Sequence, residues 1–260
     1  IVDFIYTLIN PARTAAFAGV KGLRVKTDPV DAKLLAAFGE SQQPKPSKKP
    51  DRDQERIRSL RRHREWLERQ LLAARNRLDT ARRSPWISQP VLGSLERTLS
   101  SLEEEVRQMA EEEELEVSDN PEWSQQIDWL TSVPGIGKKT AVMVVSELPP
   151  VSRCARSKSW VAFCGVNPEP RESGKAQWSR LSRKGSARIR AVLYMAAVSS
   201  LRCNPEVKAL GERLRAKGKP GKVRVLAAVN KLLRQCFGVL KHQRPYDPDW
   251  HKRLARPFPA

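Results

Sequence analysis

The pattern of apolar and polar positions over residues 1–42 predicts one strand followed by two helices. The opening stretch IVDFIYTLI is short, β-branched and aromatic, which is typical of a buried strand. Asn10 as N-cap, Pro11 at the first helical position and Gly19 as the stop predict the first helix, and VKTDPVDAKLLAAFGE predicts the second. Because one strand cannot form a sheet, this order indicates the end of an α/β unit, followed by a Pro- and Lys-rich linker over residues 43–54.

Apolar residues at alternating spacings of three and four predict a coiled coil over residues 55–117. The segment RSPWISQP divides it into two helical stretches, the first rich in Arg and the second in Glu. Complementary charge favours packing them as a hairpin or pairing them between protomers, and the alternative is a solvated helical spacer held by its apolar seam. The seam positions are Ile57, Leu60, Arg64, Leu67, Leu71, Ala74, Leu78, Leu92, Leu95, Leu99, Leu102, Val106 and Met109.

Residues 127–247 show apolar positions at helical spacing, interrupted by the turn sequences PGIG, NPEP, NP and GKPGK. Lys and Arg occupy many of the polar positions between the apolar ones. The pattern predicts a small all-α domain with a basic surface, and a basic tail follows over residues 248–260.

Net charge narrows the choice of partner. The chain has 260 residues, and its 48 Lys plus Arg outnumber its 29 Asp plus Glu, for a formal net charge of +19 at pH 7. This surplus predicts a polyanionic partner, because each neutralised phosphate releases a counterion. No apolar run approaches the roughly 18–20 residues that a membrane-spanning helix needs, and no signal peptide is visible, so we expect a cytoplasmic protein that binds nucleic acid and no membrane.

The cysteines do not point to a zinc or redox site. They form no C-x-x-C pair and have no His at ligand spacing. We therefore expect reduced, mostly buried thiols at Cys154, Cys164, Cys203 and Cys236.

The segment SVPGIGKKTA is a candidate for binding a nucleic-acid backbone. Glycines allow close approach of the main chain, and free N–H groups at a helix start can bind a phosphate oxygen. With its lysines the segment resembles a helix-hairpin-helix, a module that holds the backbone without reading bases. The alternative is a plain glycine turn between helices, whereas the spacing excludes a Walker A loop. The residues concerned are Gly135, Gly137, Lys138, Lys139 and Thr140.

Asp28 and Asp31, in KTDPVDA, are three residues apart and would project to the same side of a helix. Carboxylates in this arrangement can share a Mg²⁺ ion, which prefers oxygen ligands and keeps water molecules for a substrate phosphate. The alternative is helix capping, with Asp28 as N-cap, Pro29 at the first helical position and Asp31 favouring the helix dipole. Both roles can hold at once.

Residues 168–190 surround a serine–glycine pair with seven basic side chains. A serine that attacks phosphorus needs a group that removes its proton and positive charge that holds the phosphate. The basic residues meet the second need, but no His lies nearby to meet the first. Ser173 is therefore either a nucleophile or a loop hydroxyl that contacts phosphate. The basic residues beside it are Arg171, Lys175, Arg180, Arg183, Lys184, Arg188 and Arg190.

Taken together, the motifs resemble those of one family. In order, the chain contains INPARTAAFA, KTDPVDAKLLAAF, the coiled-coil insert, LTSVPGIGKKTA, FCGVNPEPRESGKA, LSRKGSARIRAVLYMAA, ERLRAKGKPGKV and PYD. This ordered set resembles the IS110 family of bacterial insertion-sequence transposases, also called bridge-RNA-guided recombinases, from Ile1 to Asp247.

The resemblance implies a composite active site. In that family an N-terminal RuvC-like domain with an RNase H-like fold supplies the acids Asp, Glu, Asp and Asp, which bind Mg²⁺, and a C-terminal domain supplies a serine. The last two acids fall on Asp28 and Asp31, and the serine falls on Ser173. The implied reaction is attack of the seryl oxygen on a DNA phosphate, while a structured guide RNA pairs with donor and target DNA.

The resemblance also implies a shortened N-terminal domain. The first Asp and the Glu would lie upstream of Ile1, because Asp3 and Glu40 stand in the wrong motifs. We therefore expect residues 1–42 to be an incomplete RuvC-like domain, and residues 55–117 to form a homodimer or tetramer. A nucleoid-associated DNA recombinase and a non-catalytic nucleic-acid-binding protein both stay open, and a RuvC-like junction nuclease would need the missing acids but no serine.

Overall fold

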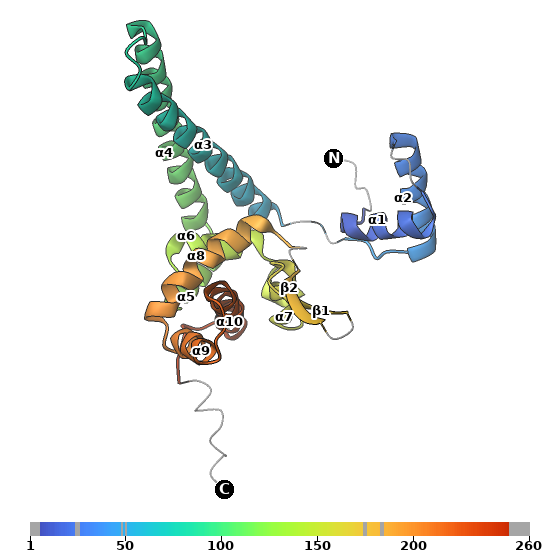
Figure 1. Ribbon diagram of the computed structural model, residues 1–260. Helices are drawn as coiled ribbons and strands as arrows, with labels where there is room; N and C mark the ends of the chain where they lie inside the picture. The colour runs from blue at the N-terminus through green and yellow to red at the C-terminus, as the bar shows by residue number, and fades with distance from the viewer. Residues whose placement is uncertain are drawn as a thin grey trace. The chain divides into compact units, whose positions relative to one another are not determined.

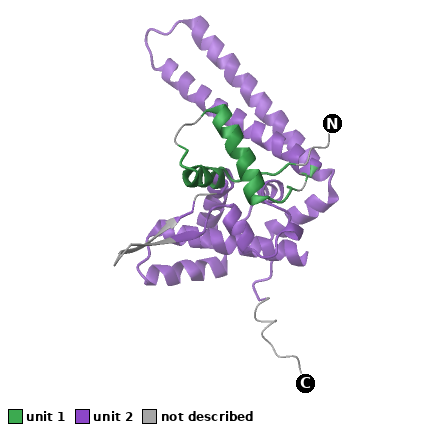
Figure 2. Cartoon of the chain, turned by 90° about the vertical axis from the view of Figure 1, so that its right-hand side faces the viewer, with its two compact units in different colours: residues 1–51 green, residues 52–260 purple. Residues whose placement is uncertain are grey.

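A computed structural model shows a mostly helical protein (Figure 1). The chain divides into two compact units, residues 1–51 and residues 52–260 (Figure 2). No helix in the described part of the chain is long and apolar enough to cross a membrane. The described residues are 6–23, 27–47, 49, 51–173, 176–182 and 185–249, with the backbone alone described at 170–173 and 176–180.

The first unit contains two helices, α1 (Pro11–Val20) and α2 (Asp28–Gln42). Asn10 caps α1 as predicted, because its side-chain oxygen accepts a hydrogen bond of 2.9 Å from the second backbone N–H of the helix. Phe17 and Phe38 pack edge to face, with ring centroids 5.4 Å apart, and so hold the two helices together. Both predicted helices are confirmed.

Two details of this unit differ from the prediction. Helix α1 continues one residue past Gly19. The predicted strand is wrong over its described part, because residues 6–9 have no regular structure. Instead of a ladder they form isolated hydrogen bonds to Ser47, whose backbone N–H donates to the Tyr6 carbonyl at 2.9 Å and whose hydroxyl accepts from the Leu8 N–H at 2.8 Å. A strand requires a paired neighbour, and the described residues of this unit provide none.

The second unit begins with a long helical hairpin, α3 (Arg52–Arg82) and α4 (Gln89–Ser118), which lie side by side in Figure 1. Each predicted seam position is buried or half-buried, and Ile57, Leu67 and Leu78 are the most buried of them. The predicted coiled-coil hairpin is therefore confirmed, with α3 starting three residues earlier than expected.

Ion pairs join the Arg-rich helix to the Glu-rich helix along this hairpin. Arg75 Nη2 lies 2.8 Å from Glu103 Oε1, and Arg82 Nη2 lies 2.9 Å from Glu96 Oε1. The predicted complementarity of charge thus acts within one chain.

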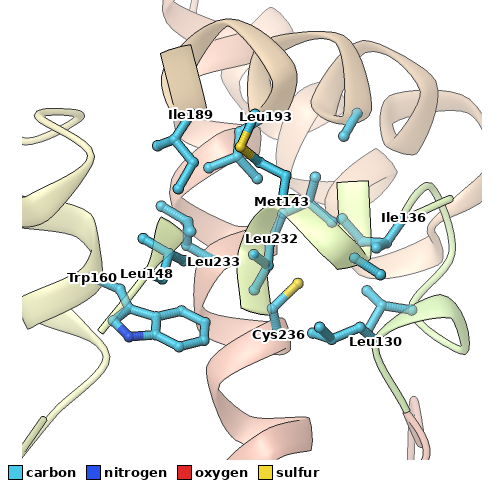
Figure 3. Close-up of a cluster of buried hydrophobic side chains, with 14 of the residues drawn as sticks. Leu130, Ile136, Met143, Leu148, Trp160, Ile189, Leu193, Leu232, Leu233 and Cys236 are labelled. Atoms are coloured by element: carbon cyan, nitrogen blue, oxygen red, sulfur yellow. The ribbon is translucent and has the colours of Figure 1, made fainter. Parts of the chain in front are cut away.

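The rest of the second unit is a helical body with one hydrophobic core. Figure 3 shows the centre of this core, where Met143, Leu193 and Leu232 come together from three different helices. Ile57 of α3 and Val117 of α4 belong to the same buried cluster, so the base of the hairpin and the body fold as one. The helices of the body are α5 (Pro121–Thr131), α6 (Lys138–Glu147), η1 (Val151–Arg153), α7 (Lys158–Phe163), α8 (Ala187–Cys203), α9 (Pro205–Ala216) and α10 (Gly221–His242).

The body also contains an antiparallel β-hairpin, β1 (Pro168–Ser173) and β2 (Ala176–Leu181). The prediction of an all-α domain is wrong at this point. The reason is that the two strands are short and polar and satisfy each other by backbone pairing, so no apolar alternation reveals them in the sequence.

The four cysteines are free thiols, as predicted. Cys164 and Cys236 are buried, and burial raises the pKa of each thiol to about 12. Cys154 is half-buried and Cys203 is exposed, so only two of the four are buried.

Candidate functional site

Ser173 lies in the last residue pair of the β-hairpin. The antiparallel register runs from Pro168 opposite Leu181 to Ser173 opposite Ala176. The serine therefore ends β1, immediately before the connection between the strands. Outside the described part of the chain lie Lys175, Arg183 and Lys184, together with the side chains of Arg171, Ser173 and Arg180.

The other end of the hairpin is fixed by the close approach of two glycines. A Cβ on Gly185 would lie 2.4 Å from the backbone N of Gly165 and 2.1 Å from the carbonyl oxygen of Phe163. Gly165 has a φ of +64°, which favours glycine. The backbone N–H of Ser182 donates to the Asn167 carbonyl at 3.0 Å. These contacts hold the base of the hairpin against the end of α7 and the start of α8.

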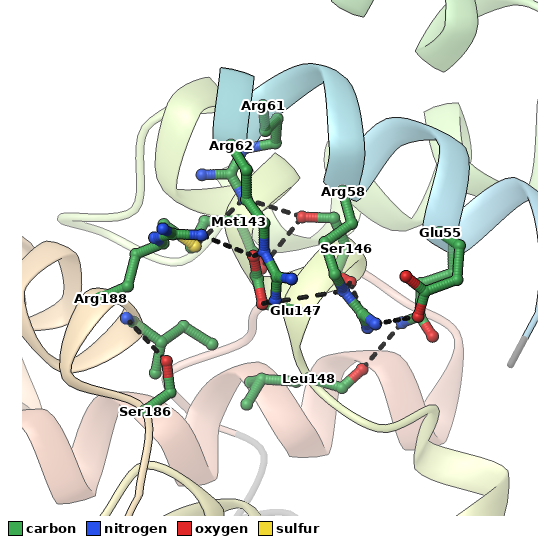
Figure 4. Close-up of polar contacts among 12 residues, drawn as sticks. Glu55, Arg58, Arg61, Arg62, Met143, Ser146, Glu147, Leu148, Ser186 and Arg188 are labelled. Atoms are coloured by element: carbon green, nitrogen blue, oxygen red, sulfur yellow. Dashed lines mark hydrogen bonds and ion pairs between the residues drawn. The ribbon is translucent and has the colours of Figure 1, made fainter. Parts of the chain in front are cut away.

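Two of the predicted phosphate ligands, Arg188 and Arg190, contact the protein itself. Arg190 Nη1 donates to the Cys164 carbonyl at 3.0 Å and so reinforces the base of the hairpin. Arg188 Nε lies 2.8 Å from Glu65 Oε2. Its Nη1 lies 3.9 Å from Glu147 Oε1 (Figure 4). The Arg188 side chain remains 35% exposed. These ion pairs connect the first turn of α8 to both α3 and α6.

Further arginines at the base of α3 form a network with Ser146 and Glu147 of α6 (Figure 4). The same network includes Glu113 of α4. Arg61 Nη1 donates to Ser146 Oγ at 2.8 Å, and Arg61 Nε lies 3.5 Å from Glu113 Oε1. Arg62 forms a two-pronged pair with Glu147, at 3.2 Å and 3.1 Å. Burial lowers the pKa of Arg61 and raises the pKa of Glu113, although their mutual attraction acts in the opposite direction. Positive charge on this face of α3 is neutralised inside the protein.

The PGIG turn connects α5 to α6, and its two glycines have different surroundings. Gly135 has a φ of +97°, and a Cβ there would lie 2.0 Å from Ser200 Oγ on α8. This position therefore requires glycine for packing. Gly137 is the exposed N-cap of α6, with open space where a Cβ would lie.

The polar residues that follow the turn also differ from one another. Lys138 is exposed and pairs with Glu114 of α4. Lys139 is exposed, and within the described residues it forms no ion pair. Thr140 is half-buried. Lys139 is thus the side chain of this segment that is available to a phosphate.

Asp28 and Asp31 lie in the first turn of α2. The N-cap is Thr27, so the prediction of Asp28 as N-cap is wrong by one residue. Asp28 is exposed and Asp31 is half-buried, and neither forms an ion pair with another described residue. Their oxygens suit Mg²⁺, which proteins often bind through two carboxylates plus substrate phosphates. No group of three or more His, Cys, Asp or Glu that could hold a metal occurs among the described residues.

The residues that fix the serine hairpin are not among the predicted site residues. Gly165 and Gly185 are visible in the sequence, but their mutual contact depends on how α7 and α8 pack. Glu65 and Glu147 come from helices that are distant in sequence from Arg188. A local sequence pattern cannot predict such contacts, because each joins segments that are distant in sequence and meet only in the folded chain.

Two parts of the chain match family models. Residues 3–81 match a DEDD transposase model of the IS110 group, which is described as "Transposase". Residues 127–212 match a model described as "Transposase IS116/IS110/IS902 family". Together the two matches cover more than half of the chain.

Two curated relatives extend the similarity over almost the full length. They are the pilin gene-inverting proteins of Moraxella bovis and Moraxella lacunata, each 28% identical to this chain over 250 residues. The aligned region is 95% of this chain and 76% of each relative. With two models of one family matched in order, and the motifs of that family between and within them, the chain belongs to the IS110 family of transposases.

Proposed function

We propose that this chain is a DNA recombinase that cuts and rejoins DNA through a covalent link between Ser173 and a DNA phosphate. One observation carries the proposal: Ser173 ends β1, and the base of its hairpin is fixed by Gly165, Gly185 and Arg190. A fixed base limits the positions that Ser173 can reach, which lowers the entropic cost of meeting a target phosphate.

In the proposed reaction the oxygen of Ser173 forms a bond to the phosphorus, and the bond from phosphorus to the leaving strand breaks. The proton of the seryl hydroxyl ends on the released strand, either directly or through solvent. The other basic residues of the hairpin region would hold the phosphate charge, since Arg188 and Arg190 contact protein groups. These are Arg171, Lys175, Arg180, Arg183 and Lys184.

Asp28 and Asp31 would hold Mg²⁺ in the proposed site. The ion supplies positive charge that stabilises the negative charge of the reacting phosphate. The exposure of Asp28, and the absence of a described ion pair at either carboxylate, leave both residues available for this role. The RuvC-like, RNase H-like domain to which they would belong is part of the same proposal.

We further propose DNA and a structured guide RNA as partners, and a dimer or tetramer through residues 55–117. The relatives are named for inverting a pilin gene, and inversion requires cutting and rejoining of DNA. Several apolar side chains on the α3–α4 hairpin are exposed, which supports contact with a second copy. They include Trp66, Leu72, Trp86 and Val91.

The serine is tested by trapping a covalent protein–DNA species on labelled donor DNA in the presence of guide RNA and Mg²⁺. Ser173→Ala should abolish the species, whereas Ser179→Ala, on the opposing strand of the same hairpin, should leave it unchanged. An adduct that survives Ser173→Ala would falsify the nucleophile assignment. Salt-dependent binding without any adduct from the wild-type chain would support the non-catalytic alternative.

The carboxylates are tested in the same assay. Asp28→Asn and Asp31→Asn should each lower adduct formation at limiting Mg²⁺, and higher Mg²⁺ should restore part of it. Glu40→Gln is the matched control, because Glu40 is an exposed acid in the last turn of the same helix. Equal Mg²⁺ titrations for all of these variants would contradict the proposed Mg²⁺ site.

A further inference from the structure

The segment from the end of α9 to the start of α10 carries a concentration of unpaired positive charge. Between Arg213 and Arg224 the sequence contains six basic residues and no acid. Within the described residues none of the six forms an ion pair, unlike most arginines of α3. Five of them are exposed, and Arg224 is half-buried with its Nε buried and lacking a hydrogen-bond partner. The members of this basic corner are Arg213, Arg215, Lys217, Lys219, Lys222 and Arg224.

A groove of about 500 Å³ lies beside the basic corner. Its apolar lining includes Leu210 of α9 and Val223, Leu226 and Ala227 of α10. Lys222 lies one helical turn before Leu226, so the two face the same side of α10. Charge and apolar surface therefore adjoin each other here.

The polar side of the groove is formed by Asn230, Lys231 and Arg234. Arg234 Nε donates to Asn230 Oδ1 at 2.9 Å, and Lys231 pairs with Glu206 at 2.6 Å. These contacts hold the side chains in place while leaving the remaining guanidinium N–H groups of Arg234 able to meet a polar edge. An apolar lining with a few fixed polar groups is the usual composition of a small-ligand site.

We propose that the basic corner and the groove bind an unpaired stretch of DNA, with one base in the groove and the neighbouring phosphates on the corner. The groove is large enough to admit a base. A base inside a duplex has its faces stacked and its edge paired, so it cannot enter. Charge complementarity selects a phosphate-linked ligand over an apolar one.

The position of the groove favours DNA as the occupant, a choice that rests on the recombinase function proposed above. Pro168 and Leu181, the first pair of the β-hairpin, also line the groove. Ser173 lies five residues further along β1, or about 17 Å at a rise of about 3.4 Å per residue. A strand attacked at Ser173 would therefore pass within a few nucleotides of the groove.

The test is fluorescence anisotropy of the full chain with three labelled ligands of equal length: oligothymidine, oligouridine and duplex DNA. The double variant Lys219→Gln/Lys222→Gln should weaken binding of oligothymidine about tenfold near 0.1 M salt. It should also lower the slope of log affinity against log salt by about 1.4, at about 0.7 for each charge on a single strand. Lys241→Gln, an exposed charge at the far end of α10, is the control and should change the slope least.

Ala227→Phe fills the groove without changing charge. It should weaken binding of oligothymidine and leave binding of duplex DNA unchanged. Ala209→Phe, on the exposed face of α9, should leave the affinity for both ligands unchanged. Thermal unfolding of each variant checks that it is folded, and if Ala227→Phe is unfolded, photocrosslinking of iodouracil-containing single strands to residues 219–234 replaces it. The proposal would be overturned if the charge variant bound oligothymidine as tightly as the wild-type chain, or if Ala227→Phe weakened binding of duplex DNA equally. Crosslinks outside residues 219–234, or tighter binding of oligouridine than of oligothymidine, would also overturn it. Anisotropy and crosslinking measure binding and do not require reaction at Ser173. A chain that forms no Ser173 adduct can therefore still bind single-stranded DNA in the groove, and each proposal can fail without the other.

Discussion

The α3 helix and the corner between α9 and α10 are both rich in basic residues, but they use this charge in opposite ways. On α3, Arg61 and Arg64 contact Glu113, and Arg62 contacts Glu147. At the corner, Arg213 through Arg224 form no ion pair within the described residues. Net charge therefore predicts that a protein binds a polyanion. The location of the binding surface depends on which basic side chains have no acidic partner within the protein.

The comparison also separates two kinds of predicted site residue. Arg188 and Arg190, chosen from sequence as phosphate ligands, are bound to protein groups that position the serine hairpin. Lys139 remains exposed and unpaired among the described residues. Supporting residues and contacting residues look alike in a sequence because both are simply Arg or Lys.

The largest expected effect comes from breaking the buried network on α3. Glu113→Gln should lower the free energy of unfolding by about 3 kcal/mol, because it removes the buried acid that Arg61 and Arg64 share and leaves them only the more exposed Glu65 and Glu68. Urea denaturation measures the change. The matched control is Glu103→Gln, which removes an exposed partner of Arg75 and should cost at most about 1 kcal/mol. Equal losses for the two variants would show that burial of the network contributes nothing.

The next effect distinguishes the two glycines of the PGIG turn. Gly135→Ala should lower the free energy of unfolding by about 1–3 kcal/mol, because φ is +97° and the new Cβ would meet Ser200. Gly137→Ala has open space and should change stability by less than about 1 kcal/mol. If Gly137→Ala nevertheless weakens DNA binding, the exposed N-terminus of α6 acts as a contact surface. Equal thermal stability of the two variants would argue against the packing role of Gly135.

A smaller effect tests the free and paired charges directly. Arg215→Gln should lower the slope of log affinity for single-stranded DNA against log salt by about 0.7, as expected for one lost phosphate contact. Arg75→Gln should leave the slope unchanged, because Arg75 already pairs with Glu103. Anisotropy titrations at several salt concentrations give both slopes. The reverse order would mean that the hairpin, not the corner, carries the nucleic acid.

The last effect concerns pH and is small near pH 9. Burial raises the pKa of Cys164 and Cys236 to about 12, from an ordinary value of 9.0. Above pH 9 the unfolded chain releases these protons while the folded chain keeps them, so the free energy of unfolding should fall as pH rises from 9 towards 12.

Cys203 is exposed and should react with iodoacetamide first in the native protein. Fast labelling of Cys236 in the folded chain would contradict this account.

How far the fold could be predicted depends on whether a segment is stabilised locally. The caps and periodicity of α1 and the seam of α3 and α4 are local, and they were predicted correctly because helix hydrogen bonds lie within a few residues. The opening strand was wrong over its described part because its formation depends on a neighbour. The β1–β2 hairpin was missed for the same reason, since its strands are stabilised by each other and not by an apolar pattern.

Residue order and composition are enough to predict the helices, the coiled-coil seam, the surplus of positive charge and the family. Which charges lack an ion-pair partner, and which glycines pack closely against other segments, follows only from the folded chain. Arg61 meets Ser146 across 85 residues, and Gly135 meets Ser200 only because the turn after α5 packs on α8. Electrostatic and packing energies fall steeply with distance in space, and distance along the chain does not specify distance in space.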